Sequence, residues 1–209
     1  MATEECKPRD PEETPTDTAK KAEKKWNPKG DLYDIVEMLA MVTIIVMFTF
    51  AFLIRLNIVD GISMETTLHN GEYLAVSDLF YTPEWGDIVI VHKINAGHYT
   101  NPLVKRVIAT AGQTVDIDFD TWTLTVDGEV VDEESYRFLD PRYKTLEAEY
   151  AFPITVPEGH IFVLGDNRNC SADSRTLDIQ TVDERCVVGK ALVRLLPFGR
   201  FTVFENPYE

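Results

Sequence analysis

The sequence predicts a mainly β domain, in which antiparallel sheets form a partly closed barrel, preceded by one N-terminal transmembrane helix. Two observations support this fold class. One long uncharged segment lies near the N-terminus, and the chain after it consists of short apolar runs between turn signals. With 209 residues, 44% of them hydrophobic, the chain is long enough for an anchor and one folded domain.

The predicted anchor is centred on the stretch from Met38 to Ile54, which contains no charged residue. With its apolar shoulders it covers residues 35–59 and reaches the ~20 residues needed to cross a ~30 Å hydrocarbon core. A buried core helix is disfavoured because the segment is apolar all round and has no amphipathic period. A cleaved secretory signal is also disfavoured, because the apolar core is long and no small-x-small cleavage site follows it.

The orientation of this anchor follows from the basic residues beside it. Residues 56–91 contain no Lys or Arg, whereas five lysines precede the segment: Lys20, Lys21, Lys24, Lys25 and Lys29. The positive-inside rule therefore predicts a single-pass protein of the cytoplasmic membrane with its N-terminus in the cytoplasm and residues 60–209 outside. Residues 1–34 are predicted to be a cytoplasmic tail, disordered because its first part is rich in Glu, Lys, Pro and Thr.

The exported part is predicted to contain several short strands and one hairpin. In the hairpin, residues 123–131, an Asp127-Gly128 pair between β-formers is typical of a primed turn. The acidic stretch 118–158 lies between two hydrophobic strand groups and is predicted to form a small inserted lobe. The other predicted strands cover residues 72–76, 87–92, 103–109, 113–117, 160–165 and 186–196.

Charge and cysteine content exclude several function classes. The net charge of -15 disfavours nucleic acid, which requires a clustered positive surface. The cysteines, Cys6, Cys170 and Cys186, show no zinc-ligand spacing, and we expect no metal or cofactor. Cys170 and Cys186 could pair in an oxidising compartment, but two buried or partly buried free thiols are favoured.

Two segments contain residues that could carry chemistry, although neither is decisive alone. Ser63 follows Gly61 in a turn just after the anchor, where a serine is usually a turn or cap residue. Lys105 stands within an apolar strand, and alternation places it and Arg106 on opposite faces, so at least one cation must approach apolar surroundings. On this fragment alone, a lysine that protects an edge strand against aggregation is the favoured interpretation.

A third segment, Gly165 to Arg175, contains two Asp, two Arg, two Ser and two Asn after a predicted strand. A solvated loop is one interpretation. A metal loop using Asp166, Asn167 and Asp173 is another, but the EF-hand spacing is missing. The remaining interpretation is a network of paired aspartates and arginines that holds an active site in place.

These segments, in this order after a single span, resemble the bacterial type I signal peptidase (leader peptidase) family in its single-span, Gram-positive-like form. The resemblance rests on Ser-Met-x-x-Thr-Leu at 63–68, Gly-Asp-Ile-Val at 86–89, Lys105-Arg106, the 165–175 segment and Gly-Lys-Ala at 189–191. Two departures are Thr66, where the family usually has proline, and Ala-Gly-Gln at 111–113, where it usually has Pro-Gly-Asp. Both departures affect turn rigidity more than proton transfer.

The resemblance implies a serine endopeptidase with Ser63 as nucleophile and Lys105 as general base. Such a lysine must be neutral, which requires burial to lower its pKa far below ~10.4. Ser171 occupies the position that orients the lysine amine. Asp166, Arg168, Asp173 and Arg175 match the residues that tie the loop together. The Ser63 backbone N–H should receive the oxyanion, because Gly61 offers no hydroxyl.

The implied partners are the lipid bilayer and preproteins, whose signal peptides end in small residues of the Ala-x-Ala type and bind as an extended strand. Four residues beside the motifs are predicted to wall the substrate pocket, with plain core packing as an equal alternative: Val59, Met64, Leu74 and Val104. The close spacing of Ser63 and the anchor places cleavage at the outer membrane face.

Three other functions compete with this interpretation. A Ser-His-Asp hydrolase could use His69, His92, His98 or His160, but lysine stands where eukaryotic and archaeal relatives carry histidine. Self-cleaving repressors share a Ser-Lys dyad but are cytosolic and carry a DNA-binding module. A catalytically inactive membrane-tethered β-domain that binds partners is the alternative from a non-enzyme class.

Overall fold

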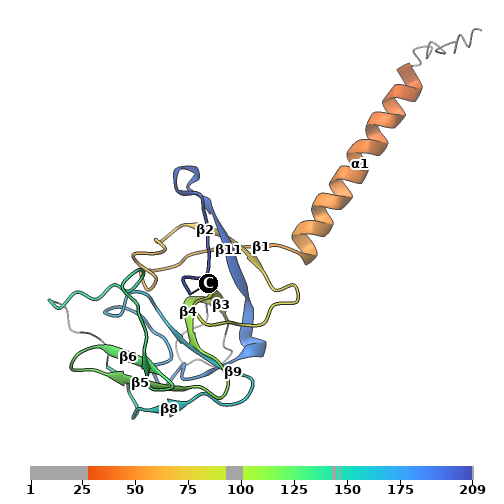
Figure 1. Cartoon of the computed structure of the whole chain (residues 1–209). Helices are drawn as coiled ribbons and strands as arrows, with labels where there is room; N and C mark the ends of the chain where they lie inside the picture. Colours follow the sequence, from red (N-terminus) through yellow and green to blue (C-terminus); the bar gives the residue numbers. More distant parts are fainter. Residues whose placement is uncertain (1–27, 93–100, 143–144, 146, 209) are drawn as a thin grey trace, which may run out of the picture. The chain divides into compact units, whose positions relative to one another are not determined.

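The structure is a computed structural model that describes residues 28–92, 101–142, 145 and 147–208 (Figure 1). The chain divides into two compact units, residues 1–43 and 44–209. Most of the predicted tail, with four of its five flanking lysines and Cys6, lies outside the described residues.

Helix α1 covers Pro28–Phe52, and its segment Asp31–Phe50 is long and apolar enough to cross a membrane by length and composition. The predicted anchor, 35–59, overlaps this helix only as far as Phe52. Residues Arg55–Ile58 instead form strand β1, which pairs antiparallel with β2. Polar Arg55 and Asn57 alternate there with apolar neighbours, which is the period of a strand.

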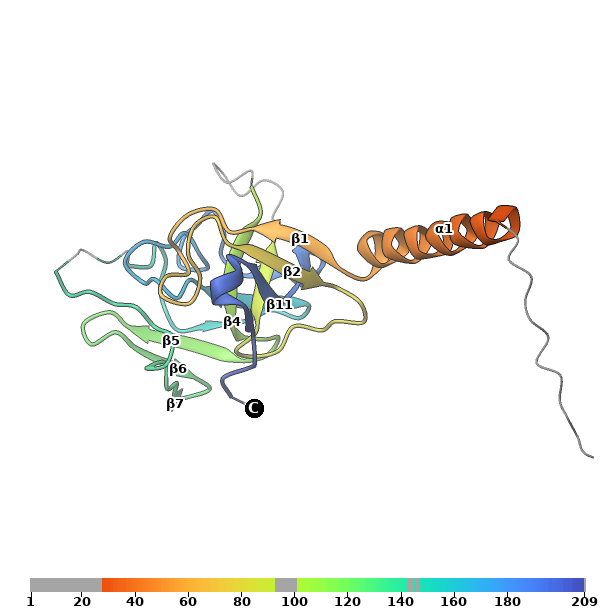
Figure 2. The same cartoon turned by 90° about the horizontal axis from the view of Figure 1, so that it is seen from above.

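A large antiparallel sheet forms the body of the second unit, in the strand order β1-β2-β11-β3-β4-β9-β10, with β12 added to β11 (Figures 1 and 2). Bulges interrupt the pairing of β11 with both neighbours and let the sheet curl into a half-barrel. The mainly β fold class is therefore confirmed. The strands are β2 (Tyr73–Ser77), β3 (Ile88–Val91), β4 (Leu103–Ala109), β9 (His160–Leu164), β10 (Val182–Asp183), β11 (Val187–Leu196) and β12 (Thr202–Val203), with short helices η1 (Glu184–Cys186) and η2 (Phe198–Arg200).

A second sheet of four strands, in the order β7-β6-β5-β8, gathers on one side of the large sheet in both views (Figures 1 and 2). Its strands are β5 (Thr114–Asp118), β6 (Thr123–Val126), β7 (Glu129–Val130) and β8 (Ile154–Thr155). Asp127 and Gly128 both have positive φ, 53° and 84°, as the primed hairpin turn requires. The small sheet begins at β5, just before the predicted insert of 118–158.

Each strand predicted from the sequence is present to within one residue at either end. The strands that were not predicted are short: β1, β8, β10 and β12. Segments of two to four residues are too short to show an alternating pattern.

Three hydrophobic clusters form the core, and β3 contributes to two of them. Ile88 and Ile90 pack in one cluster with Met64 and Leu68, whereas Val89 and Val91 pack in another, around β9. Burial of both faces explains why β3 is a continuous apolar run without polar alternation. A further cluster, which includes Ile108, Val115 and Phe162, joins the two sheets.

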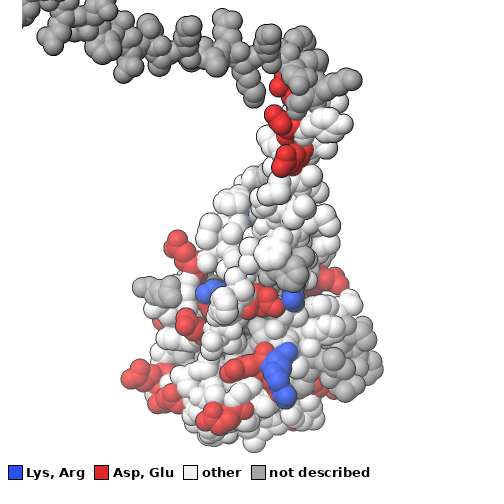
Figure 3. Space-filling view, turned by 90° about the vertical axis from the view of Figure 1, so that its right-hand side faces the viewer, with Lys and Arg blue, Asp and Glu red and all other residues white. Residues whose placement is uncertain are grey.

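The surface of the described residues reflects the acidic composition. On the face shown in Figure 3, acidic side chains are scattered widely and the few basic ones lie among them. Cys170 is exposed and Cys186 is half-buried, and both are free thiols. The expectation that both thiols are at least partly buried is therefore wrong for Cys170, because the 165–175 loop turns it outward.

Candidate active site

Ser63 lies in the turn between β1 and β2, and the local sequence anchors this turn to the core. Met64 and Leu68 are fully buried, and the Leu68 N–H donates to Met64 O at 2.8 Å, which closes one turn of chain. Ser63 itself is half-buried, so its hydroxyl sits at the boundary between the core and solvent.

Lys105 lies in the middle of β4 and is only 1% exposed. Its Nζ is 2.8 Å from Ser63 Oγ, so the structure brings together the predicted nucleophile and base, which are far apart in sequence. The amine makes a second hydrogen bond, donating to Val104 O at 2.8 Å. Within the described residues no carboxylate forms an ion pair with this amine.

Burial lowers the pKa of the Lys105 amine from 10.5 to about 8. The negative charges of Asp173 and Asp166 oppose this shift, and the positive charge of Arg175 adds to it. A buried amine with this pKa is partly neutral near pH 7 and holds a lone pair within hydrogen-bond distance of the Ser63 hydroxyl. The pair can therefore transfer a proton from serine to lysine.

An open cleft of about 390 Å³ gives access to both side chains. The other residues that line it are Asp60, Gly61, Ile62, Asn101, Pro102, Leu103, Cys170 and Ala172. The predicted pocket residues Val59, Met64, Leu74 and Val104 are buried together in one core cluster and are not among the lining residues. Their contact with substrate stays a prediction.

Ser171 is 2% exposed and lies directly against Gly165, where an added Cβ would sit 2.1 Å from Ser171 Oγ and 2.5 Å from Ser63 O. Glycine is therefore required at 165 so that three segments can approach closely. Within the described part of the chain, no hydrogen bond joins the Ser171 hydroxyl to the lysine amine. Its role in orienting that amine stays a prediction.

A buried ion pair between Asp173 and Arg175 holds the 165–175 loop at its C-terminal end. Arg175 donates to both carboxylate oxygens of Asp173, at 2.8 and 2.9 Å, and the Gly165 N–H donates to the same carboxylate at 3.0 Å. Burial alone would raise the pKa of Asp173, but the adjacent Arg175 guanidinium outweighs it and holds that pKa below its usual value. Arg175 also donates to Arg168 O at 3.1 Å, which closes the loop.

Two further pairs connect this loop to the rest of the domain. Arg106 donates to both oxygens of Asp166, each at 2.8 Å, and Thr67 donates to the same carboxylate. Arg168 donates to both carboxylate oxygens of Glu133, which belongs to the predicted insert of 118–158. Asp166, Arg168, Asp173 and Arg175 thus all take part in the ion-pair network (these four residues together with Arg106 and Glu133).

Three residues that support the site are not predicted from the sequence as site residues: Arg106, Glu133 and Asn167. Arg106 was noted as the second cation of β4, without a partner, and Glu133 gave no local signal. From the sequence alone, Asn167 is a candidate metal ligand and a member of the 165–175 motif, without an assigned role at the site. In the structure the Asn167 backbone N–H donates to Ser63 O at 3.0 Å, and its side-chain amide donates to Ile62 O at 3.1 Å. The proximity of Asn167 to the motif aspartate was the one available signal.

The histidine interpretation finds no support in this geometry. His98 lies outside the described residues, and His69, His92 and His160 make no hydrogen bond to Ser63. The ring of His69 instead lies 3.8 Å from the Glu72 carboxylate.

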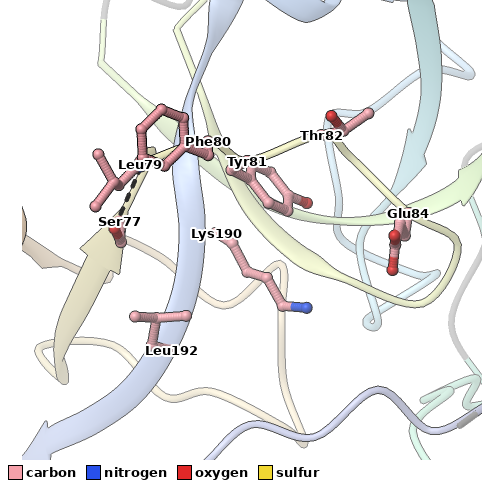
Figure 4. A pocket seen from close by; sticks show the side chains of 8 residues that line it. All are labelled: Ser77, Leu79, Phe80, Tyr81, Thr82, Glu84, Lys190 and Leu192. Carbon is pink, nitrogen blue, oxygen red and sulfur yellow. Dashed lines mark hydrogen bonds between the residues drawn. The ribbon is translucent and has the colours of Figure 1, made fainter.

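A second hollow, of about 510 Å³, lies between β11 and residues 77–84 (Figure 4). Lys190 projects into it, and exposed Leu79 and Phe80 form part of its rim. Two polar side chains of this hollow are already engaged, because Lys190 pairs with Asp87 at 2.6 Å and Tyr81 donates to the same carboxylate at 2.7 Å. Ser77 and Lys190 both line this hollow, but among the described residues no hydrogen bond joins their side chains, in contrast to Ser63 and Lys105.

Comparison with known proteins shows the family of the chain. A family model described as signal peptidase, peptidase S26, matches residues 32–196. The signal peptidase I of Bacillus licheniformis is 35% identical over 188 residues, which cover 85% of this chain and 95% of that protein. The signal peptidase IB of Staphylococcus aureus is 31% identical over 196 residues, covering 86% and 97%.

A solved structure of a signal peptidase I from Enterococcus faecalis aligns with 53% of this chain and 97% of that chain, at 29% identity and a TM-score of 0.41. The extent of the family match and the identity to the curated relatives decide the assignment. The chain belongs to the signal peptidase family, peptidase S26, and is a serine peptidase of the signal peptidase I type.

Proposed function

We propose that this protein is a membrane-anchored endopeptidase that removes N-terminal signal peptides from preproteins by means of a Ser63–Lys105 dyad. The contact of 2.8 Å between Lys105 Nζ and Ser63 Oγ carries this proposal. Burial of the lysine supports it further, because a pKa lowered to about 8 makes a neutral base accessible at physiological pH.

The reaction would proceed in two halves. Neutral Lys105 accepts the proton of the Ser63 hydroxyl while Oγ attacks the scissile carbonyl carbon, and the carbonyl oxygen becomes an oxyanion beside the Ser63 N–H. The Lys105 ammonium then donates its proton to the leaving amine, the C–N bond breaks, and an acyl-enzyme remains. Water, deprotonated by the neutral lysine, hydrolyses this ester and restores the Ser63 hydroxyl.

The substrate and the place of cleavage follow from the site and its position in the chain. An open cleft favours an extended peptide bound as an added strand, and small residues of the Ala-x-Ala type would bring their backbone close to Ser63. Ser63 comes shortly after the end of α1 at Phe52. The lysines before α1 favour a cytoplasmic N-terminus, which leaves the cleft at the outer membrane face.

Cleavage of a purified preprotein by the full chain in detergent tests the dyad. We expect Ser63→Ala and Lys105→Ala each to lower kcat/KM by at least about 10³-fold, because the two groups act as a unit. Full activity in either variant would disprove the dyad. Wild-type protein that binds preprotein without cleaving it would favour the inactive membrane-tethered domain instead. Protease accessibility of the two termini in intact cells tests the orientation.

A further inference from the structure

Asn167 holds the Ser63 segment through two consecutive carbonyl groups. Its backbone N–H donates to Ser63 O at 3.0 Å, and its side-chain Nδ2 donates to Ile62 O at 3.1 Å. The side chain is only 4% exposed, so these hydrogen bonds are shielded from competing water. One residue of the 165–175 loop therefore grips the peptide groups on both sides of Ser63.

The side-chain bond acts on the peptide group that contains the Ser63 N–H. A peptide unit is planar, with its C=O and N–H pointing in opposite directions, so fixing the Ile62 carbonyl also fixes the direction of the Ser63 N–H. A donor on the carbonyl also polarises the unit and makes its N–H a stronger donor. The Glu65 N–H also donates to Ile62 O, at 3.2 Å.

The Ser63 N–H is available for a ligand. Among the described residues it donates to no protein group, whereas the nearby Gly61 N–H is already bonded to Asn70 Oδ1 at 2.9 Å. Gly61 has no side chain that could add a second donor. The direction of this one backbone donor therefore has a large influence on how well an oxyanion is stabilised.

We propose that Asn167 is a positioning residue, whose side-chain amide orients and polarises the Ser63 N–H that receives the oxyanion. This inference rests on the proposed function. Cleavage by wild type and its loss in Ser63→Ala are therefore measured first, so that failure of the proposed function is a separate result.

The test compares Asn167→Ala and the nearly isosteric Asn167→Leu with the matched control Asn169→Ala. Asn169 belongs to the same loop, but its side-chain amide donates to Asp140 O and Thr145 Oγ1, at 3.2 and 2.9 Å, in the inserted lobe. We expect kcat to fall about 10- to 100-fold in both Asn167 variants, with KM unchanged within about threefold. The control should keep its kcat. The acid limb of the pH profile should not move, because the surroundings of Lys105 are unchanged.

A peptide aldehyde supplies a second readout, because its adduct with Ser63 places an oxyanion beside the same N–H. Its affinity should fall in parallel with kcat/KM, whereas the affinity for a product peptide should stay constant. Unchanged kcat in the two Asn167 variants would overturn the inference. An equal loss of kcat in Asn169→Ala, or a loss confined to KM, would overturn it as well, since either result would assign the effect to loop stability or to ground-state binding. If Asn167→Ala fails to fold, the Leu variant decides between these outcomes.

Discussion

Lys105 and Arg106 are neighbours in β4, are 1% and 4% exposed, and belong to two different electrostatic regions. The lysine faces the cleft, where its amine contacts a hydroxyl and a carbonyl. The arginine belongs to the ion-pair network, where it donates to both carboxylate oxygens of Asp166. The pKa of the lysine is lowered by burial, whereas that of the arginine is raised, because its hydrogen bonds to Asp166 outweigh burial.

This difference shows how the pKa of a buried amine can be lowered even close to buried carboxylates. Each carboxylate of the ion-pair network already accepts hydrogen bonds from an arginine: Asp166 from Arg106, Asp173 from Arg175 and Glu133 from Arg168. The negative charge of these carboxylates, which would stabilise a charged Lys105, is thereby largely compensated by the arginines. Desolvation then dominates at the lysine.

The largest difference should appear when Lys105 loses its amine without losing its length. Lys105→Met should lower kcat/KM by at least about 10³-fold, since no base remains. Its free energy of unfolding should not decrease, and at pH 7 it should rise by up to about 3 kcal/mol, because the folded wild type must take up a proton at a pKa of about 8 instead of 10.5.

This gain should fade as the pH rises from 8 to 10.5, where the unfolded lysine also loses its proton. Preprotein cleavage and urea unfolding of the full chain in detergent measure the two effects. A Lys105→Met protein that is much less stable than wild type at pH 7 would contradict the comparison.

Replacement of the next residue, Arg106, by methionine should lower the free energy of unfolding, in contrast to Lys105→Met. Arg106→Met leaves the Asp166 carboxylate buried without its partner, so the free energy of unfolding should fall by about 3–5 kcal/mol. Arg185→Met is the matched control, because the Arg185–Asp183 pair is exposed, with 89% of the arginine side chain accessible. The control should change stability by less than about 1 kcal/mol. Equal effects of the two substitutions in urea unfolding would refute the role assigned to burial.

Gly165→Ala should disturb the packing between the ion-pair network and the segment that carries Ser63. The new Cβ would lie 2.5 Å from Ser63 O, so the loop and the Ser63 segment must separate. We expect kcat to fall about 10²-fold, because misplacement of reacting groups by about 1 Å has an effect of this size. Gly199→Ala is a suitable control, since a Cβ there meets no atom within 4 Å, and its activity should remain normal.

The smallest expected effect is a shift in the pH dependence of kcat/KM. In wild type, kcat/KM should fall as the pH drops below about 8, because protonation removes the base. Asp173→Asn removes the negative charge that most strongly favours the ammonium form, so the pKa of Lys105 should fall further and the acid limb should move to lower pH. Asp183→Asn, at an exposed pair, should leave the limb in place. A shift to higher pH in Asp173→Asn would refute the assigned interaction.

Much of this architecture was predictable because local sequence carries it. The strands lie between clear turn signals, and the motif segments identify Ser63 and Lys105 without any knowledge of their contact. Strand β1 was missed because its apolar residues, Leu56 and Ile58, continue the composition of the anchor. In a strand that short, alternation is masked by the neighbouring run.

The supporting contacts could not be predicted, because they join residues far apart in sequence. Glu133 and Arg168 are 35 residues apart, and Ile62 and Asn167 are 105 residues apart. The hydrogen bond between Ser171 and the lysine amine, which family resemblance implies, is not formed in this structure. Such side-chain geometry depends on close packing around Gly165 and not on residue type alone.

The position of β11 also limits when the large sheet can be completed during synthesis. This late strand lies between β2 and β3 in the large sheet, so the earlier strands lack a central partner until the ribosome has passed residue 196. The roughly one hundred residues between β3 and β11 take about 5–20 s to translate. The turn that carries Ser63 lies between β1 and β2, and β2 is paired on its other side with β11. The sheet that supports both Ser63 and Lys105 is therefore complete only once β11 has been translated.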